Sequence, residues 1–355
     1  MSVVRAGPWM NLKVLIVGCG AIAQQHMEVW QKIPNVHVIA VCDSNERLAA
    51  KAAGAWGVSN YYTDPTSMLT HEKGSIVDVC TPPQTHMRLV LDSLSNGYHV
   101  LVEKPVAPTS QDVATMIEAQ GKACRKVGVI HNWLFEPTMM RAVSVARRNE
   151  LGEILAVSTE VLQTQDDPML STREHWCHSL PGGRFGECLP HPIYILQAFL
   201  SGLNVESVVV RKVGDYSWVP FDELYAVFKA KNGMGAAYLS FNAPNYSIFV
   251  DVYGSKKMLR IDLVGQTIWE VKRKIANRVS KGAENLRLAS NLVSSTLRSA
   301  ILVSSHRWRS GHETYIRAFV ESIVRDTDPP VSLEEARENA RLIEQTMTAI
   351  GQRAA

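Results

Sequence analysis

A glycine-rich turn near the amino terminus constrains the fold more than any other stretch of the chain. The apolar run at residues 12–17 (LKVLIV) leads directly into the sequence GCGAIA at residues 18–23, and a helical stretch follows to about Lys32. In the pattern G-x-G-x-x-A, the first glycine permits a tight turn, the second lets backbone approach a diphosphate, and the alanine allows close helix–strand packing. The helix start offers free N–H groups to phosphate oxygens. We predict a dinucleotide site whose backbone contacts come from Gly18, Gly20, Ala21 and Ile22; a turn with only a packing role is the alternative.

An acidic residue after the second predicted strand supports this interpretation. The strand at residues 36–42 ends in Asp43, at about the distance of 20 residues from the glycines at which a carboxylate accepts hydrogen bonds from ribose hydroxyls. A carboxylate there repels a 2′-phosphate, so NAD is favoured as the cofactor. Arg47 lies nearby and keeps NADP as the less favoured alternative.

The pattern of strand and helix then repeats. Apolar strand-like runs occur at residues 76–80, 99–102 and 127–132, and helical stretches are predicted at residues 44–55, 84–95 and 109–126. Strands that alternate with helices indicate a parallel, doubly wound sheet. The length of 355 residues favours a second domain. The predicted fold class is therefore α/β, with a Rossmann domain at residues 1–132 followed by an α+β domain at residues 133–355.

Two of these strands end in residues suited to ligand binding. The run 76–80 (IVDVC) breaks into Thr81-Pro82-Pro83, whose prolines hold backbone that can line a flat ring, and His86 follows in the next helix. The apolar run at residues 100–102 ends in Glu103-Lys104-Pro105. The carboxyl ends of strands are where open α/β sheets bind ligands. Partial burial and a neighbouring cation both favour a neutral amine, so Lys104 is a candidate proton-transfer group. A Glu–Lys pair that only caps the strand is the alternative.

Together these motifs resemble the glucose–fructose oxidoreductase / inositol dehydrogenase / MocA family of NAD(P)-dependent enzymes. The resemblance rests on the glycine turn, Asp43, the stretch TPPQTH at residues 81–86 and the stretch EKP at residues 103–105, and it is closest over the first 135 residues. It implies that residues 81–83 pass beside the nicotinamide, that Lys104 lies by the reacting carbon, and that the Lys104–Pro105 peptide bond is cis. Its implied cofactor contacts are Thr81, Pro82, Pro83, His86, Glu103 and Lys104.

The second domain contains a further chemical cluster. The segment 182–191 (GGRFGECLPH) resembles the family's D-x-x-x-H motif, with Glu187 in place of the acid and His191 as the histidine. The resemblance implies that Lys104 and His191 transfer the hydroxyl proton and that Glu187 supports them. Tyr194 stands where the family usually has an aspartate, and the arginine often found near Trp133 is missing. Trp133 is a candidate to stack on a sugar ring, with a role in the core as the alternative.

Two other sites must be considered. His175, Cys177, His178, Cys188 and His191 form a patch of the residue types that bind zinc, but their spacing is irregular and no metal site is predicted. Residues 272–310 contain nine basic residues and one acidic residue, a net charge of +8, so the rest of the chain carries −5 of the total of +3. Their helical spacing predicts an insertion packed across the sheet with a solvated basic face; contact with an anionic membrane surface is the less favoured alternative.

Strands are predicted at residues 205–213, 223–230, 235–241, 247–253, 257–263 and 267–271. They indicate an open, largely antiparallel sheet, and helices are predicted at residues 312–324 and 333–350. The bare face of such a sheet is expected to mediate a homo-oligomer, a dimer or a tetramer.

The composition places the chain among ordinary globular proteins. The small net charge gives no reason to expect a nucleic-acid partner. Six dispersed cysteines and the absence of a signal-like apolar segment favour reduced thiols and a cytoplasmic location. The expected function is hydride transfer between a nicotinamide cofactor and a secondary alcohol or ketone of a sugar, polyol or sugar derivative. The alternative is a catalytically inactive NAD(P)-binding protein of the same fold with a regulatory or scaffolding role.

Overall fold

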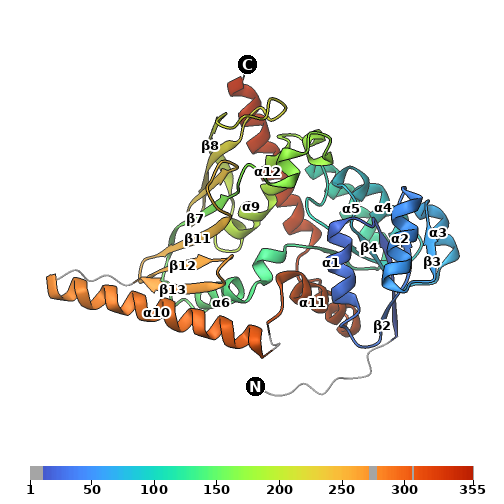
Figure 1. Cartoon of the computed structure of the whole chain (residues 1–355), viewed down its shortest axis with the longest axis horizontal. Coiled ribbons are helices and arrows are strands. Elements are labelled where there is room, and N and C mark those ends of the chain that lie inside the picture. Colours follow the sequence, from blue (N-terminus) through green and yellow to red (C-terminus); the bar gives the residue numbers. More distant parts are fainter. Residues whose placement is uncertain (1–10, 272–277, 306–307, 355) are drawn as a thin grey trace. The chain divides into compact units, whose positions relative to one another are not determined.

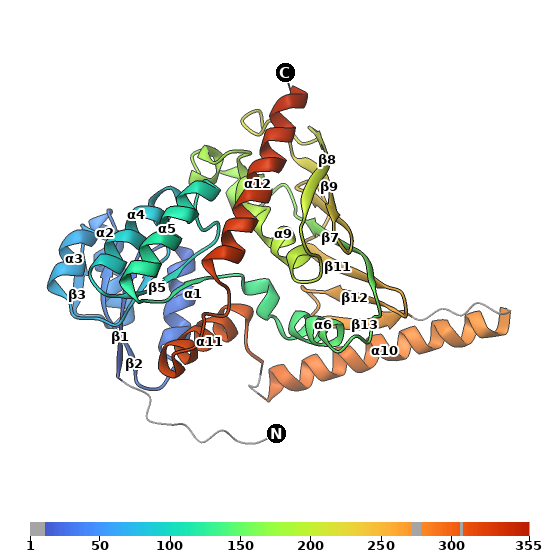
Figure 2. The same ribbon diagram turned by 180° about the vertical axis from the view of Figure 1, so that it is seen from behind.

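The structure is a computed structural model that describes residues 11–271, 278–305 and 308–354 (Figures 1 and 2). The chain forms two compact units, and each is built from two separate stretches. The first unit comprises Met1–His131 and His312–Ala340; the second comprises Asn132–Gly311 and Arg341–Ala355. Among the described helices, none combines the length and apolar character that crossing a bilayer requires.

The first unit is organised around a six-stranded sheet. Its strands are β1 (Leu12–Val17), β2 (Val36–Cys42), β3 (Asn60–Tyr62), β4 (Ile76–Val79), β5 (His99–Val102) and β6 (Val127–Val129). The helices after these strands are α1 (Ala21–Trp30), α2 (Glu46–Trp56), α3 (Pro65–His71), α4 (His86–Ser95) and α5 (Ser110–Ala123), with a 3₁₀ turn η1 (Pro83–Thr85) before α4. The alternation predicted from the sequence is confirmed.

All pairings in this sheet are parallel, and the strand order is β3-β2-β1-β4-β5-β6. The order reverses between β1 and β4, which is the position where doubly wound sheets open a crevice at the carboxyl ends of their strands. Because β2, β1, β4 and β5 are parallel neighbours, the segments that follow them all leave the sheet at the carboxyl ends of the strands.

A segment far along the chain completes the first unit. Helix α11 (Gly311–Arg325) and the first residues of α12 (Leu333–Ala354) pack with it. A Cβ added to Gly128 of β6 would lie 2.6 Å from the Phe319 ring, so a glycine is required for this close approach. Lys126 forms an ion pair with Asp326 at 3.0 Å. The sequence prediction placed residues 312–340 in the second domain, and the structure differs because this packing joins residues distant in sequence.

The second unit contains a seven-stranded sheet. Its strands are β7 (Ile154–Leu162), β8 (Asn204–Arg211), β9 (Glu223–Ala230), β10 (Gly233–Ser240), β11 (Ser247–Gly254), β12 (Met258–Asp262) and β13 (Thr267–Val271). The order is β13-β12-β11-β7-β10-β9-β8, and only β10 with β7 is parallel. The predicted, largely antiparallel sheet is confirmed.

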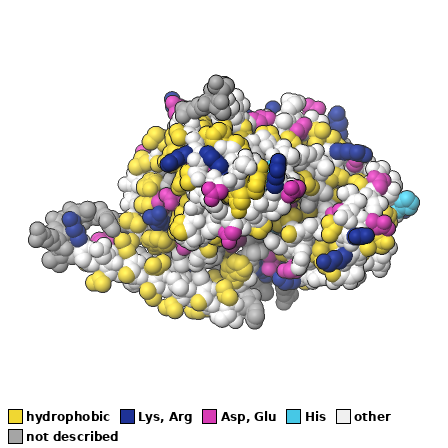
Figure 3. Space-filling model, turned by 45° about the horizontal axis from the view of Figure 1, so that its top comes forward, with side chains coloured by type: hydrophobic (Ala, Val, Ile, Leu, Met, Phe, Trp, Pro, Cys, Tyr) yellow, Lys and Arg dark blue, Asp and Glu magenta, His cyan; other side chains and the backbone are white. Residues whose placement is uncertain are grey.

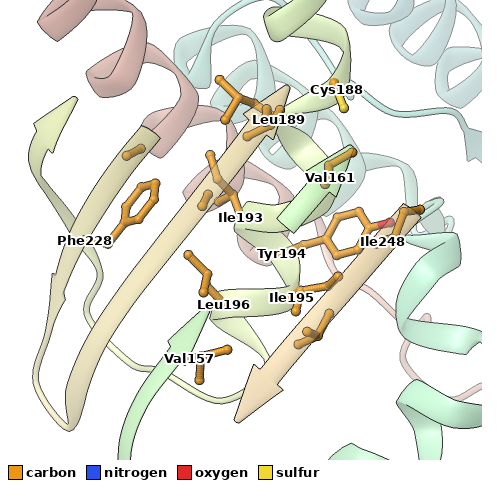
Figure 4. Packing of buried hydrophobic residues seen from close by; sticks show 14 of the residues in the cluster. Val157, Val161, Cys188, Leu189, Ile193, Tyr194, Ile195, Leu196, Phe228 and Ile248 are labelled. Atoms are coloured by element: carbon orange, nitrogen blue, oxygen red, sulfur yellow. The ribbon is translucent and has the colours of Figure 1, made fainter. Parts of the chain in front are cut away.

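Short helices surround one face of this sheet. They are η2 (Asn132–Phe135), α6 (Pro137–Arg147), α7 (Pro168–Ser171), η3 (Trp176–Ser179), α8 (Arg184–Cys188) and α9 (Pro190–Gln197). Every residue of α9 except Gln197 is buried, as expected for a helix that is apolar on all sides. Ile193 and Leu196 of α9 belong to the same hydrophobic cluster as Val157 of β7 and Phe228 of β9 (Figure 4). The core of the second unit therefore lies between α9 and the sheet.

The basic segment predicted as a helical insertion forms α10 (Arg278–Ser304). It lies along β13, the edge strand of the seven-stranded sheet, in both ribbon views (Figures 1 and 2). Residues 272–277, with the predicted helix position Ile275, lie outside the described residues.

Candidate functional site

The glycine turn leaves room for a ligand at the start of α1. Gly18 has a φ of +93°, and a Cβ there would lie 2.7 Å from the carbonyl oxygen of Cys80, so only glycine fits between β1 and β4. At Gly20, by contrast, nothing lies within 4 Å of the position of a Cβ. No side chain caps the first N–H groups of α1. Gly20 and Ala21 are exposed, so the backbone N–H groups at the positive end of the helix dipole can bind an anion.

Asp43 lies beside this turn. Its carboxylate accepts hydrogen bonds from the backbone N–H of Cys19 at 2.9 Å and from that of Asn45 at 2.9 Å. The side chain is half-buried, and two oxygens that each accept one N–H keep further lone pairs for other donors. The carboxylate is thus held in a fixed orientation next to the glycine turn, as the predicted ribose contact requires.

A buried histidine, His86, holds the loop after β4 in place. His86 is fully buried, and its Nε2 lies 2.7 Å from the carbonyl oxygen of Thr81 while its Nδ1 lies 3.2 Å from that of Val106. Burial lowers the pKa of His86, which favours the neutral ring. Thr81 and Pro82 are half-exposed. The predicted ring-lining role therefore remains a prediction for Thr81, Pro82 and Pro83, whereas His86 supports this loop from the interior.

Glu103 and Lys104 follow β5 at the same edge of the sheet. The Lys104–Pro105 peptide bond is cis, as the resemblance implied. Glu103 is buried, and its carboxylate accepts a hydrogen bond from the backbone N–H of Lys104 at 3.0 Å. Lys104 is half-buried. Glu103 therefore holds the backbone of Lys104 in place through this hydrogen bond.

A buried charge network lies behind these residues and was not foreseen. His26 of α1 is completely buried; its Nδ1 lies 3.0 Å from Asp78 of β4, and its Nε2 lies 3.1 Å from Glu103. Trp30 donates its ring N–H to Asp78 at 2.7 Å, and His312 of α11 lies 3.5 Å from Glu103. Both imidazole nitrogens of His26 thus face carboxylates, which favours the doubly protonated ring.

Electrostatics follow from this arrangement. Burial is the largest single influence and opposes the charge of His26, but the charges and hydrogen bonds of Asp78 and Cys80 together outweigh it and hold the pKa of His26 well above its usual value. Burial likewise opposes the charge of Glu103, but hydrogen bonds from His26 and His312 hold its pKa well below the usual value. The aspartate inside the apolar run IVDVC was the signal that could have revealed the network, because a buried carboxylate needs a partner.

In the second unit, His191 contacts Trp133 and Tyr194. The Trp133 ring stacks on the imidazole with centroids 3.9 Å apart, and Nδ1 lies 2.6 Å from the hydroxyl of Tyr194. That hydroxyl also receives the backbone N–H of Trp133 at 3.1 Å and lies 3.3 Å from the side-chain oxygen of Asn132. The structure thus brings the two predicted substrate residues, Trp133 and His191, into contact.

Glu187 belongs to a separate ion-pair network. Its carboxylate forms a short ion pair with Arg184, whose Nε lies 2.8 Å from Asp167. All three side chains are nearly buried. Glu187 and His191 belong to different helices, α8 and α9, because α9 begins at Pro190. The spacing of four residues therefore does not place them on one helical face, and Arg184 is a residue to which the sequence assigned no role.

The His/Cys-rich patch does not gather as a metal site. Among the described residues, groups of three potential metal ligands occur only around His26: with Glu103 and His312, and with Asp78 and Cys80. The hydrogen bonds described above already account for both nitrogens of His26. The six cysteines are free, as expected.

Comparison with known families identifies both units. Residues 12–131 match the model of an oxidoreductase family, described as an NAD-binding Rossmann fold, and residues 146–354 match that family's C-terminal alpha/beta domain. The two matches together span most of the described chain.

Curated relatives align over shorter stretches. D-apiose dehydrogenase from Paraburkholderia graminis is 27% identical over 40% of this chain and 38% of that protein. D-glucoside 3-dehydrogenase from Escherichia coli is 29% identical over 43% and 44%, and inositol 2-dehydrogenase from Burkholderia ambifaria is 32% identical over 31% and 34%. The chain spans less than half the length of each of these three curated relatives.

Solved structures share the fold over almost the full chain. The WlbA dehydrogenase from Bordetella pertussis, in complex with NADH and UDP-GlcNAcA, has a TM-score of 0.81 at 17% identity and covers 97% of this chain and 96% of that one. Scyllo-inositol dehydrogenase from Lactobacillus casei, with NAD(H) and scyllo-inositol bound, has a TM-score of 0.77 at 18% identity and covers 97% and 98%. At these identities the likeness establishes the fold alone.

Proposed function

This chain belongs to the glucose–fructose oxidoreductase / inositol dehydrogenase / MocA family of NAD-binding oxidoreductases, and on that premise we propose that it is a dehydrogenase. The proposed reaction transfers hydride between NAD and a secondary alcohol or ketone of a sugar, polyol or sugar derivative. The relatives named as sugar and inositol dehydrogenases support this substrate class.

One observation carries the proposal. Four segments suited to a dinucleotide follow four neighbouring strands of one parallel sheet: Asp43 after β2, the glycine turn after β1, residues 81–83 after β4 and Lys104 after β5. A crevice at the switch point of such a sheet is where a dinucleotide binds. Packing alone does not require a ligand-binding residue type at each of these four strand ends.

The residues present fit NAD. The uncapped start of α1 and the open space at Gly20 suit a diphosphate, and the anchored carboxylate of Asp43 suits ribose hydroxyls while repelling a 2′-phosphate. When bound, the nicotinamide supplies the acceptor for the two electrons of the hydride. NAD is therefore the expected cofactor, and NADP is the weaker ligand.

The chain's own residues handle the proton. In the oxidative direction the carbinol C–H bond breaks as hydride leaves, and the hydroxyl proton must pass to a base. We propose that Lys104 Nζ and His191 Nε2 shuttle this proton, with one group accepting it from the hydroxyl and passing it to the other. Glu103 fixes the backbone of Lys104, and Tyr194 and Trp133 orient the His191 ring. In the reductive direction the same groups return the proton to the alkoxide oxygen. Glu187 remains a predicted supporting acid, with its charge balanced by Arg184.

The substitution Lys104→Ala tests this assignment. We expect turnover of the sugar or polyol that the wild-type protein oxidises to fall by at least about 100-fold, because a positioned proton-transfer group contributes that much or more. NAD affinity, measured by isothermal titration calorimetry, should change little. Lys122→Ala on the exposed face of α5 is the matched control. Retained turnover, or loss of NAD binding in the variant, would contradict the assignment.

A second candidate function is supported by the changed second motif. Glu187 is engaged by Arg184, and Tyr194 stands in place of the family's usual aspartate. These features suit an NAD-binding regulatory or scaffolding protein without catalysis. NAD binding together with no NADH formation across a panel of sugars, polyols and sugar nucleotides would favour this candidate and remove the first.

The bare face of the seven-stranded sheet is proposed as a homo-oligomer contact. Val209, Tyr225, Met234 and Tyr253 are exposed, and the pairing register places them on the same face. An apolar sheet face of this kind is rarely left to solvent. Sedimentation velocity that finds only monomers at micromolar concentration would remove this proposal.

A further inference from the structure

Helix α10 turns a largely polar face toward the sheet, and its less exposed residues are Glu284, Leu288, Asn291, Ser295, Ser299 and Leu302. Its inward positions alternate at intervals of three and four residues, and the most buried of them is Ser295. The Ser295 hydroxyl oxygen accepts the backbone N–H of Ile268 at 3.0 Å, and the Ser299 hydroxyl donates to the carbonyl oxygen of Gln266 at 2.6 Å. Serines of the helix therefore satisfy backbone groups at and next to β13. An edge strand needs such partners, because unpaired backbone groups invite the pairing of foreign strands.

The outward face of α10 carries an exposed apolar stripe. Leu286, Val293, Leu297 and Ile301 are 75%, 59%, 58% and 65% exposed. Val303 and Leu292, on one side of this stripe, are 58% and 44% exposed, and the other positions within the stripe are small: Gly282, Ala283, Ala289, Ser290, Ala300 and Ser304. Hydrophobic side chains gather along the lower left of Figure 3, over the region of α10. A surface helix usually buries its apolar stripe against its own domain, whereas α10 exposes that stripe to solvent.

The outward residues form a seam with the spacing of a coiled coil. They follow one another at alternating intervals of four and three residues: Leu286, Ser290, Val293, Leu297, Ala300 and Ser304. This is the heptad pattern by which one helix packs its knobs into the holes of another. Reversing the seam about Ser295 brings Leu286 opposite Ser304, Ser290 opposite Ala300, and Val293 opposite Leu297. A large side chain meets a small one at each end, and two branched side chains meet in the middle.

We propose that α10 pairs antiparallel, across a two-fold axis, with α10 of a second copy of this chain. A two-fold contact requires a surface that is complementary to itself, and the seam has this property. The proposal does not depend on the catalytic function. It concerns a surface separate from the bare sheet face.

The charges of the helix favour a second copy over a lipid surface. Among residues 281–305, Arg287 and Arg298 are the exposed cations near the seam. Both lie on the same flank of it. The same reversal about Ser295 brings Arg298 level with Leu292 and Arg287 level with Val303, so no like charges oppose each other. A helix that lies on a membrane surface carries cations along a broad polar face and bulky apolar groups opposite. Here sheet contacts occupy the polar face, and small residues interrupt the apolar stripe.

The substitution Leu297→Glu tests the pairing. A carboxylate at this central position would be buried against Val293 of the second copy, so we expect the dissociation constant of the pair to rise at least about tenfold. Light scattering on the full-length protein should show half the wild-type mass at a concentration where the wild type is fully paired. Asn285→Glu, exposed beside the seam, is the matched control and should keep the wild-type mass. Far-ultraviolet circular dichroism confirms that each variant is folded.

Mixing two variants tests the orientation. In the antiparallel pair, position 293 of one copy faces position 297 of the other, so Val293→Lys and Leu297→Glu should each lose the wild-type mass alone and regain it when mixed. In a parallel pair the new charges would not meet, and mixing would restore nothing. An unchanged mass for Leu297→Glu, or no recovery on mixing, overturns the proposal. Co-sedimentation with phosphatidylcholine–phosphatidylglycerol vesicles that Leu297→Glu abolishes, without a change in mass, also overturns it and assigns the seam to lipid.

Discussion

The two units each contain a buried histidine at their proposed site, and the two are held in opposite ways. His26 in the first unit lies between two carboxylates, those of Asp78 and Glu103. His191 in the second unit lies against an indole ring and a phenol, those of Trp133 and Tyr194. One imidazole is therefore positioned by charge and the other by shape and neutral hydrogen bonds.

This contrast indicates what each histidine can do. A doubly protonated imidazole between two carboxylates has both nitrogens engaged, so His26 stabilises the sheet edge and orients Glu103. A neutral hydroxyl beside Nδ1 favours the charged form of an imidazole less than a carboxylate does, and proton transfer needs a ring that can take both forms. The ionic cluster is suited to holding a backbone in place, and the neutral cluster is suited to chemistry.

Removing the ionic histidine should have the largest effect. The substitution His26→Ala leaves the Asp78 and Glu103 carboxylates buried without their shared partner, and breaking a buried ion pair in this way costs about 3–5 kcal/mol. We expect the free energy of unfolding, measured by urea denaturation, to fall by that amount. His37→Ala, an exposed histidine on β2, is the control and should change it by less than about 0.5 kcal/mol. If His26→Ala changed the free energy of unfolding by as little as His37→Ala, the proposed difference between the two histidine clusters would be wrong.

The ionic cluster should also reveal itself through pH. Because the pKa of Glu103 is lowered in the folded protein, its contribution is complete above pH 4.5 and is lost as pH falls through the folded pKa. Because the pKa of His26 is raised, its contribution is complete below pH 6.5 and is lost as pH rises through the folded pKa. The stability advantage of the wild type over His26→Ala should therefore be largest between pH 4.5 and 6.5. Urea titrations across this range measure it, and a flat difference would contradict the prediction.

The neutral cluster should show a smaller effect on stability. Tyr194→Phe removes the hydroxyl that meets His191 and the backbone N–H of Trp133, and losing hydrogen bonds of this kind costs about 1 kcal/mol. If His191 is catalytic, kcat should fall by roughly tenfold because the ring is no longer oriented. Tyr61→Phe, on the exposed side of β3, is the control. A loss of stability as large as that of His26→Ala would show that the two clusters do not differ in kind.

Much of the first site could be predicted because its residues lie in short motifs at strand ends. The turn at Gly18, the acid at Asp43 and the lysine at position 104 each follow an apolar run, and the fold aligns those runs side by side. A parallel sheet places all such strand ends at one edge, so the local pattern was enough to predict a shared site.

The partners of these residues could not be predicted from local patterns. His26 and Asp78 are 52 residues apart, and Glu103 meets His312 from near the other end of the chain. Charge pairing inside a core depends on the packing of whole elements, which spacing alone does not reveal. The Arg184–Glu187 pair differs, because the two residues lie three positions apart in α8, and that local spacing was a signal available in the sequence.

The orientation of α10 was also hidden from the sequence. The sequence predicted a solvated basic face, and Lys281, Arg287 and Arg298 are exposed; the exposed apolar stripe beside them was not predicted. The reason lies in β13, whose edge takes up the serine face of the helix through Ser295 and contacts nearby. The demand for hydrogen bonds at a sheet edge outweighed the usual burial of leucine and valine.

The return of residues 312–340 to the first unit bears on how this protein is made. A ribosome releases the six strands of the Rossmann sheet long before it releases Phe319, the ring that covers Gly128, or His312, a partner of Glu103. Until then the growing sheet carries an uncovered apolar surface beside β6. Completion of the first unit must therefore wait until helix α11 has emerged, which happens after all seven strands of the second sheet.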